Sequence, residues 1–201
     1  MEKHKNKLPF MAGMLFLINA VTAVGYAWIK GVHRFDLTIS FSSYVGLFRW
    51  TSVVYFISAV LMVPTLGYYA AKIRMARVKK VFYALVLMCI FGTAFFPFNT
   101  FSEAPTPVTI DLHNGFAIAL MLFTLIGFII TAVTAKDKRQ RVTALFSIAY
   151  ALIFVALYFT GAKVLFKAFF VYEIMFIILL LLALIMERYT DAAERNDKVK
   201  K

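Results

Sequence analysis

The stretch Phe95–Phe116, FFPFNTFSEAPTPVTIDLHNGF, decides how the chain folds, because it is the longest segment outside the basic loops that cannot lie in lipid. It holds three prolines, two acidic residues and His113. Proline lacks an N–H and disfavours helix in the residue before it. We therefore expect one helix to stop by Phe98 and the next to start no earlier than Thr109, with a polar loop between them.

On both sides of this loop the chain is apolar enough to lie in a membrane. Of its 201 residues, 62% are hydrophobic and 16% are charged, whereas a soluble domain is about half apolar and a quarter charged. Several apolar runs can cross about 30 Å of hydrocarbon as helices. We predict an all-α, polytopic membrane protein with a single domain, residues 1–201. Its six transmembrane helices are expected at about 8–29, 45–71, 81–96, 112–135, 142–160 and 164–186, with a charged tail at 187–201.

The first apolar run allows a second reading, because a secretory signal peptide also begins with basic residues and an apolar segment. This run is longer than a typical signal core. It ends in Tyr26 and Trp28, which suit the boundary between lipid and water. The pattern favours a retained helix.

The placement of basic residues predicts the orientation. Segments 1–7, 72–80, 136–141 and 187–201 hold 17 of the 22 Lys and Arg residues. By the positive-inside rule, both termini are cytoplasmic and the loop after Phe95 faces outward. We expect the protein to lie in the cell (inner) membrane. The same clusters explain the net charge of +12 without nucleic-acid binding. The expected partners are membrane lipids, whose anionic headgroups attract such clusters.

Glu173, in the sequence VYEIMF, is the sharpest functional signal. It lies six residues beyond Lys167, roughly 9 Å along a helix. A carboxylate at that depth is expensive and normally faces the bundle interior or a water-filled cavity. The alternative is a hydrogen-bonded glutamate that only holds helices together. The candidate partners are His113 first, and then the following outer-half residues: Arg49, Tyr44 and Thr51.

His113 follows Asp111 at the expected start of a helix. If Asp111 is the N-cap, its side chain accepts hydrogen bonds from the first turn, which His113 begins. The imidazole then either points inward toward Glu173 or a lipid headgroup, or serves only as a polar tip at the interface. The spacing of Gly115 and Ala119 predicts that another helix approaches closely here.

Other chemistry finds little support. The single cysteine, Cys89, excludes an intramolecular disulfide and a cysteine metal motif. No nucleophile elbow, P-loop or dinucleotide fingerprint is present, and Ser40 has no local base to activate it. We predict no cofactor. Outward imidazoles and carboxylates suit zinc, but they lack a ligand spacing, so no metal site is predicted. These residues are His33, Asp36, Glu103, Asp111 and His113.

Four short motifs suggest a family. They are DLTIS at 36–40, FFP at 95–97, LHNGFAIALMLF at 112–123 and VYEIMF at 171–176. Together they resemble a prokaryotic six-helix membrane family of unknown function, which is similar to the eukaryotic Frag/DRAM/Sfk group. His113 and Glu173 match that group's helix-opening histidine and last-helix glutamate, although Ile174 replaces the tryptophan that often follows. The resemblance implies six helices, an outward polar site and work on lipids.

We therefore expect lipid handling or envelope maintenance at a polar site open to the outer leaflet. The candidate site residues are Glu173, His113, Asp111 and Arg49. Two alternatives stay open, a metal-assisted membrane hydrolase acting on a lipid and a proton-coupled transporter in which Glu173 titrates. The sequence specifies neither the substrate nor the oligomeric state, and it leaves open whether the protein is an enzyme.

Overall fold

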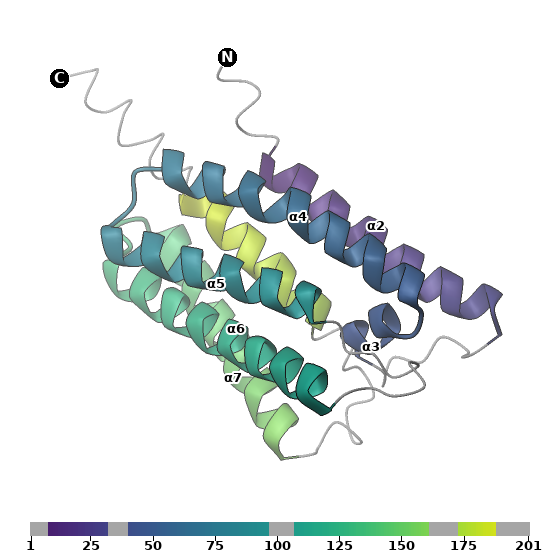
Figure 1. Cartoon of the computed structure of the whole chain (residues 1–201). Helices are drawn as coiled ribbons and strands as arrows, with labels where there is room; N and C mark the ends of the chain where they lie inside the picture. The colour runs from purple at the N-terminus through teal and green to yellow at the C-terminus, as the bar shows by residue number, and fades with distance from the viewer. Residues whose placement is uncertain (1–7, 32–39, 97–106, 161–172, 188–201) are drawn as a thin grey trace.

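The computed structural model describes residues 8–31, 40–96, 107–160 and 173–187, and the regular elements of these residues are helices (Figure 1). Most of these helices pack side by side as a bundle, and the short α3 lies at one end of it. The last helix carries no label in Figure 1, where it is yellow. The helices are α2 (Leu8–Ile29), α3 (Phe41–Gly46), α4 (Arg49–Lys72), α5 (Arg77–Phe95), α6 (Pro107–Thr134), α7 (Lys138–Phe159) and the helix at 173–187.

Five of these helices are long and apolar enough to cross a membrane. Their apolar spans have 19 to 26 residues, which corresponds to roughly 28 to 39 Å of helix. Large apolar side chains cover the outer faces of the bundle, among them Val21, Ile29 and Val133. An apolar exterior of this extent matches a lipid environment and would be unusual on a soluble monomer. The chain is a multi-pass membrane protein.

The helix at 173–187, called the central helix below, shares core clusters with all five long helices, although Ile178 and Leu182 on one of its faces are exposed. One of its faces joins α2, α4 and α5 in a core cluster through Leu180 and Leu184. Phe176 packs with residues of α6 and α7, and Leu179 does the same nearer the other end. A helix that is apolar all round belongs in an interior, and between Glu173 and Glu187 this one carries only apolar residues.

α2 joins the bundle through a stripe of small residues. Ala12, Ala20, Ala23 and Ala27 are buried at helical spacing, together with Phe16. Small side chains let helix backbones approach closely, which is a main source of packing energy inside a membrane. At Gly13 an added Cβ would lie 3.3 Å from Leu181, so α2 also lies close against the central helix.

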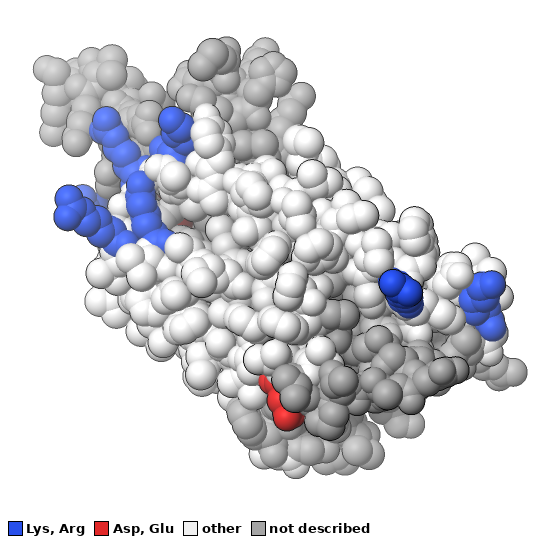
Figure 2. Space-filling view, in the orientation of Figure 1, with Lys and Arg blue, Asp and Glu red and all other residues white. Residues whose placement is uncertain are grey.

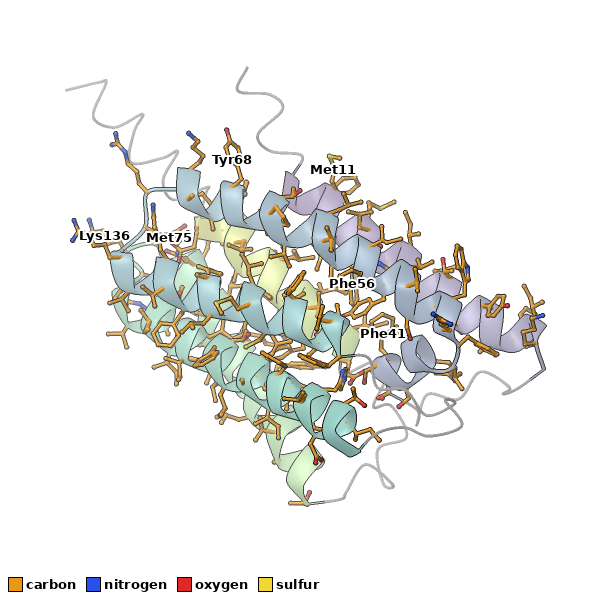
Figure 3. All side chains as sticks on the ribbon, viewed as in Figure 1. Met11, Phe41, Phe56, Tyr68, Met75 and Lys136 are labelled. Carbon is orange, nitrogen blue, oxygen red and sulfur yellow. The ribbon has the colours of Figure 1, made fainter. Side chains whose placement is uncertain are left out.

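Basic residues gather at one end of the bundle. Figure 2 shows Lys and Arg side chains clustered over the connection between α4 and α5. Two basic side chains bond backbone carbonyls at the ends of helices: Lys80 donates to the carbonyl of Ala71 at 3.0 Å, and Arg141 donates to that of Ala135 at 2.9 Å. In Figure 3, Met75 and Lys136 lie at this basic end, whereas Phe41 of α3 lies at the opposite end.

A buried ion pair lies at the same basic end, and sequence reasoning missed it. Lys79 of α5 donates to Glu187 of the central helix, and both side chains are almost fully buried. The hydroxyl of Thr131 also approaches Glu187, at 3.4 Å. The prediction of a charged tail beginning at residue 187 is therefore wrong in its first residue, since Glu187 is part of the bundle. Lys79 belongs to a helix because α5 begins at Arg77, four residues earlier than predicted.

The short helix α3 was also not predicted from the sequence. Ser40 is its N-cap and accepts a hydrogen bond from the Ser43 backbone at 3.0 Å. Instead of one helix starting near residue 45, the chain breaks after α3 and restarts at Arg49. The hydroxyl of Thr51 donates to the Val45 carbonyl at 2.8 Å, which satisfies an end group of α3 that a continuous helix would otherwise have bonded.

α6 begins earlier than expected. It starts at Pro107, not after Thr109, because proline at the first helical position loses no hydrogen bond and already has helical φ. Asp111 therefore lies inside the helix and is not its N-cap, a role that the sequence had left open. The other expectation at this loop agrees with the structure, since α5 ends at Phe95 and Phe96 is its C-cap.

Candidate functional site

A cavity of about 100 Å³ lies between the helices at the α3 end of the bundle. On α6, His113 lies seven residues nearer this end than Leu120, which is roughly 10 Å of helix. The polar side chains of the lining thus lie nearer the α3 end. The apolar side chains, here called the floor, line the cavity toward the middle of the bundle. The lining residues are Phe41, Ser42, Tyr55, Thr93, His113, Ala117, Leu120, Met121, Phe154, Glu173, Phe176 and Ile177.

Glu173 joins the central helix to α3. Its Oε2 accepts hydrogen bonds from the backbone N–H of Phe41 and from that of Ser42, the latter at 3.3 Å. The Ser42 hydroxyl approaches Oε1 at 3.5 Å. The first N–H groups of a helix have no partner within it and suit an anionic acceptor. This contact explains how the membrane tolerates the carboxylate, and it could not be foreseen without α3.

His113 is buried and bound to the end of α5. Its Nδ1 lies 2.7 Å from the Phe96 carbonyl and 3.1 Å from that of Thr93. Both partners are acceptors, so Nδ1 carries the proton and donates. In the neutral ring Nε2 is then an acceptor. The histidine thereby satisfies carbonyls that α5 leaves unpaired at its C-terminus, and it is held as one wall of the cavity.

A glycine lets α6 come close enough for this contact. A Cβ at Gly92 would lie 2.4 Å from the ring of Phe116, one helical turn after His113. The same ring stacks on Phe96, with centroids 5.8 Å apart and planes at 9°. The close approach predicted at Gly115 is not found among the described residues, because a Cβ there would meet nothing within 4 Å.

Two hydroxyl side chains complete the polar lining. Tyr55 of α4 is hydrogen-bonded to Thr93 of α5, and the Thr93 hydroxyl donates to the Ile90 carbonyl at 2.9 Å. Neither residue was singled out from the sequence. A threonine or tyrosine in an apolar helix has no spacing signal, so only the packing of the helices identifies them.

The structure separates the four predicted site residues. Glu173 and His113 line the same cavity, while Asp111 and Arg49 are exposed and do not line it. Two other expected partners of Glu173 are also engaged elsewhere: Tyr44 is buried in the core with α2, and Thr51 bonds the end of α3. Ser40 caps α3.

The described residues contain no group of three or more His, Cys, Asp or Glu side chains that could hold a metal ion. Three residues considered for such a site, His33, Asp36 and Glu103, lie outside the described part of the chain. Comparison with protein-family models, curated proteins and solved structures found no match. The class that the fold defines is therefore a multi-pass helical membrane protein with a cavity between its helices, and the resemblance to the Frag/DRAM/Sfk group stays a prediction.

Proposed function

We propose that the chain is a six-span protein of the inner membrane whose α3 end faces outward. The sixth span is the predicted helix at 164–186, of which the structure describes the part from residue 173. The start of α2 and the 187 end of the central helix lie together at the basic end, since Ala12 and Leu184 share one core cluster. With the basic end in the cytoplasm, both termini are cytoplasmic and the cavity serves the outer leaflet.

We infer that this cavity binds the headgroup of a membrane lipid, as part of lipid handling or envelope maintenance. The observation that carries the proposal is the composition of its wall. Ser42, Tyr55, Thr93, His113 and Glu173 supply polar atoms, and the floor is formed by apolar side chains, among them Leu120 and Phe176. Ligand sites combine a mostly apolar wall with a few convergent polar groups. A lipid presents the matching pair, a polar head and an apolar chain.

A cavity-filling variant tests this function. Ala117→Phe places a ring in the cavity, whereas Gly115→Phe places the same ring on the exposed side of α6, where a Cβ meets no atom within 4 Å. Native mass spectrometry of both proteins, purified in mild detergent, counts the lipids that stay bound. We expect Ala117→Phe to lose the lipid that the wild type and Gly115→Phe keep. Equal retention in all three folded proteins would refute the proposal.

A proton-coupled carrier is the second candidate, because polar groups continue below the cavity. A smaller cavity, about 10 Å³ and lined by Lys79, Tyr83 and Thr124, follows toward the basic end. The buried Thr124 hydroxyl has no hydrogen-bond partner within the described residues. A volume of this size holds about one water molecule, which is too little for a continuous water path to the basic end. Lipid binding is therefore the better supported function. If Thr124→Val abolished proton uptake by proteoliposomes without reducing lipid retention, the carrier would be favoured.

A further inference from the structure

Among the described residues, the wall of the cavity has one acidic side chain and no basic one. Glu173 is its carboxylate, and no Lys or Arg is among the described residues of its wall. The other polar groups are the hydroxyls of Ser42, Tyr55 and Thr93 and the imidazole of His113. The donors of α3 already hold Oε2 of Glu173, whereas Oε1 has only the 3.5 Å contact to the Ser42 hydroxyl and can accept a hydrogen bond from a further donor. The wall therefore suits a ligand that brings positive charge, and it opposes one that brings a phosphate.

Aromatic rings form much of the remaining wall. Phe41 and Tyr55 meet edge to face, with centroids 5.8 Å apart and planes at 80°. Phe154 and Phe176 stack, with centroids 6.1 Å apart. All four residues line the cavity that holds Glu173. Aromatic faces attract ammonium groups through the ring quadrupole, and the attraction grows when water is excluded.

We propose that the cavity selects an amphiphile whose headgroup ends in an ammonium group. The ammonium donates to Glu173, whose Oε2 is held by α3 while Oε1 has the longer contact to Ser42. Phe41 and Tyr55, which lie beside Glu173, contact the cation, and the apolar chain extends along the floor past Phe176. This selectivity rests on the proposed lipid-binding function and gives it a substrate class. The source of the ammonium group is either an aminolipid of the membrane or a soluble amine.

The test uses three probes that share a dodecyl chain and differ in their headgroup. Dodecylamine, dodecanol and monododecyl phosphate are added separately to the delipidated full-length protein in a nonionic detergent, and native mass spectrometry gives the bound fraction of each. Propylamine, which lacks the tail, is the fourth probe. We expect dodecylamine to bind at least about tenfold more tightly than either of the other dodecyl probes, because a hydrogen bond to a charged group corresponds to about one to two decades of affinity.

Two matched variants locate the effect. Glu173→Gln removes the charge but keeps the shape and the acceptor for α3, so it should lower dodecylamine affinity about tenfold and leave dodecanol unchanged. Glu187→Gln removes the other carboxylate of the same helix, which is buried outside the cavity, and should not change the selectivity for dodecylamine. If Glu173→Gln fails to fold, the ranking of the four probes on the wild type alone decides.

The outcomes separate this inference from the function beneath it. Equal or tighter binding of monododecyl phosphate or dodecanol would overturn the ammonium selectivity and leave lipid binding in place. Binding of propylamine as tight as that of dodecylamine would support the ammonium chemistry and assign it to a soluble amine, which overturns the lipid function. No binding of any probe would overturn both.

Discussion

Replacing Gly92 with alanine tests the contact between α5 and α6 on which the position of His113 depends. The added Cβ would lie 2.4 Å from the Cγ and Cδ1 atoms of Phe116, about 1 Å closer than ordinary packing distance allows. Rotating the ring about its own axis does not remove the clash, because Cγ lies on that axis. The stacking of Phe116 on Phe96 restricts the larger movement.

Two effects of opposite sign set the size of the change. Overpacking of this kind costs about 1 to 3 kcal/mol, and replacing glycine in a helix gains up to about 1 kcal/mol. We expect Gly92→Ala to lower the free energy of unfolding by about 1 to 2 kcal/mol. Gly115→Ala has the same gain in helix propensity but no clash, so this variant should be as stable as the wild type or slightly more stable.

Equilibrium unfolding in mixed detergent micelles measures both variants. A second substitution, Phe116→Leu in the Gly92→Ala protein, should recover part of the loss by making room for the new methyl group. Separation of α5 from α6 also draws His113 away from the Thr93 and Phe96 carbonyls, so lipid retention should fall in Gly92→Ala and not in Gly115→Ala. A Gly92→Ala protein as stable as the wild type would refute the close contact.

Three further predictions concern other parts of the chain. A cysteine at Thr160 should react with an impermeant thiol reagent in intact cells, whereas one at Ala76 should react only after lysis, and the reverse pattern would overturn the orientation. Lys79→Met should lower the free energy of unfolding by about 3 to 5 kcal/mol, because it leaves Glu187 buried without its cation. Adding Glu187→Leu should recover most of this loss in the same unfolding assay, and a loss that persists in the double variant would contradict the prediction. Ser40→Ala should cost about 1 kcal/mol through loss of the α3 N-cap, while Ser40→Asp should be tolerated; equal stability of Ser40→Ala and the wild type would contradict the cap.

Most of the fold follows from the sequence because membrane helices obey a simple rule of length and apolarity. The boundaries of α2 agree with the prediction, and α5 ends within one residue of it. The differences lie where polar residues belong to helices. α6 begins at Pro107, which a first turn accommodates. α5 begins at Arg77, and its first turn includes Lys79, which is paired with Glu187. Hydropathy alone assigns both of these starts to loops.

Only part of the site could be inferred in this way. Glu173 and His113 stand out because ionisable groups are rare in apolar helices. Their shortest hydrogen bonds are to backbone groups, at the start of α3 for Glu173 and at the end of α5 for His113. Every residue has such groups, so no sequence pattern marks them. The ion pair of Lys79 and Glu187 was hidden for a different reason, since both residues belong to charged runs that read as solvent-exposed.

The position of the central helix imposes an order on biogenesis. All the other described helices precede residues 173–187 in the chain, so during synthesis they enter the membrane before the segment around which they pack. Until that segment arrives, the inner faces of α2, α4 and α5 lack the helix against which they pack in the finished protein. The last helix then joins both ends of the bundle, through Glu173 to α3 and through Glu187 to Lys79 of α5. A chain that stops before residue 173 therefore has neither contact.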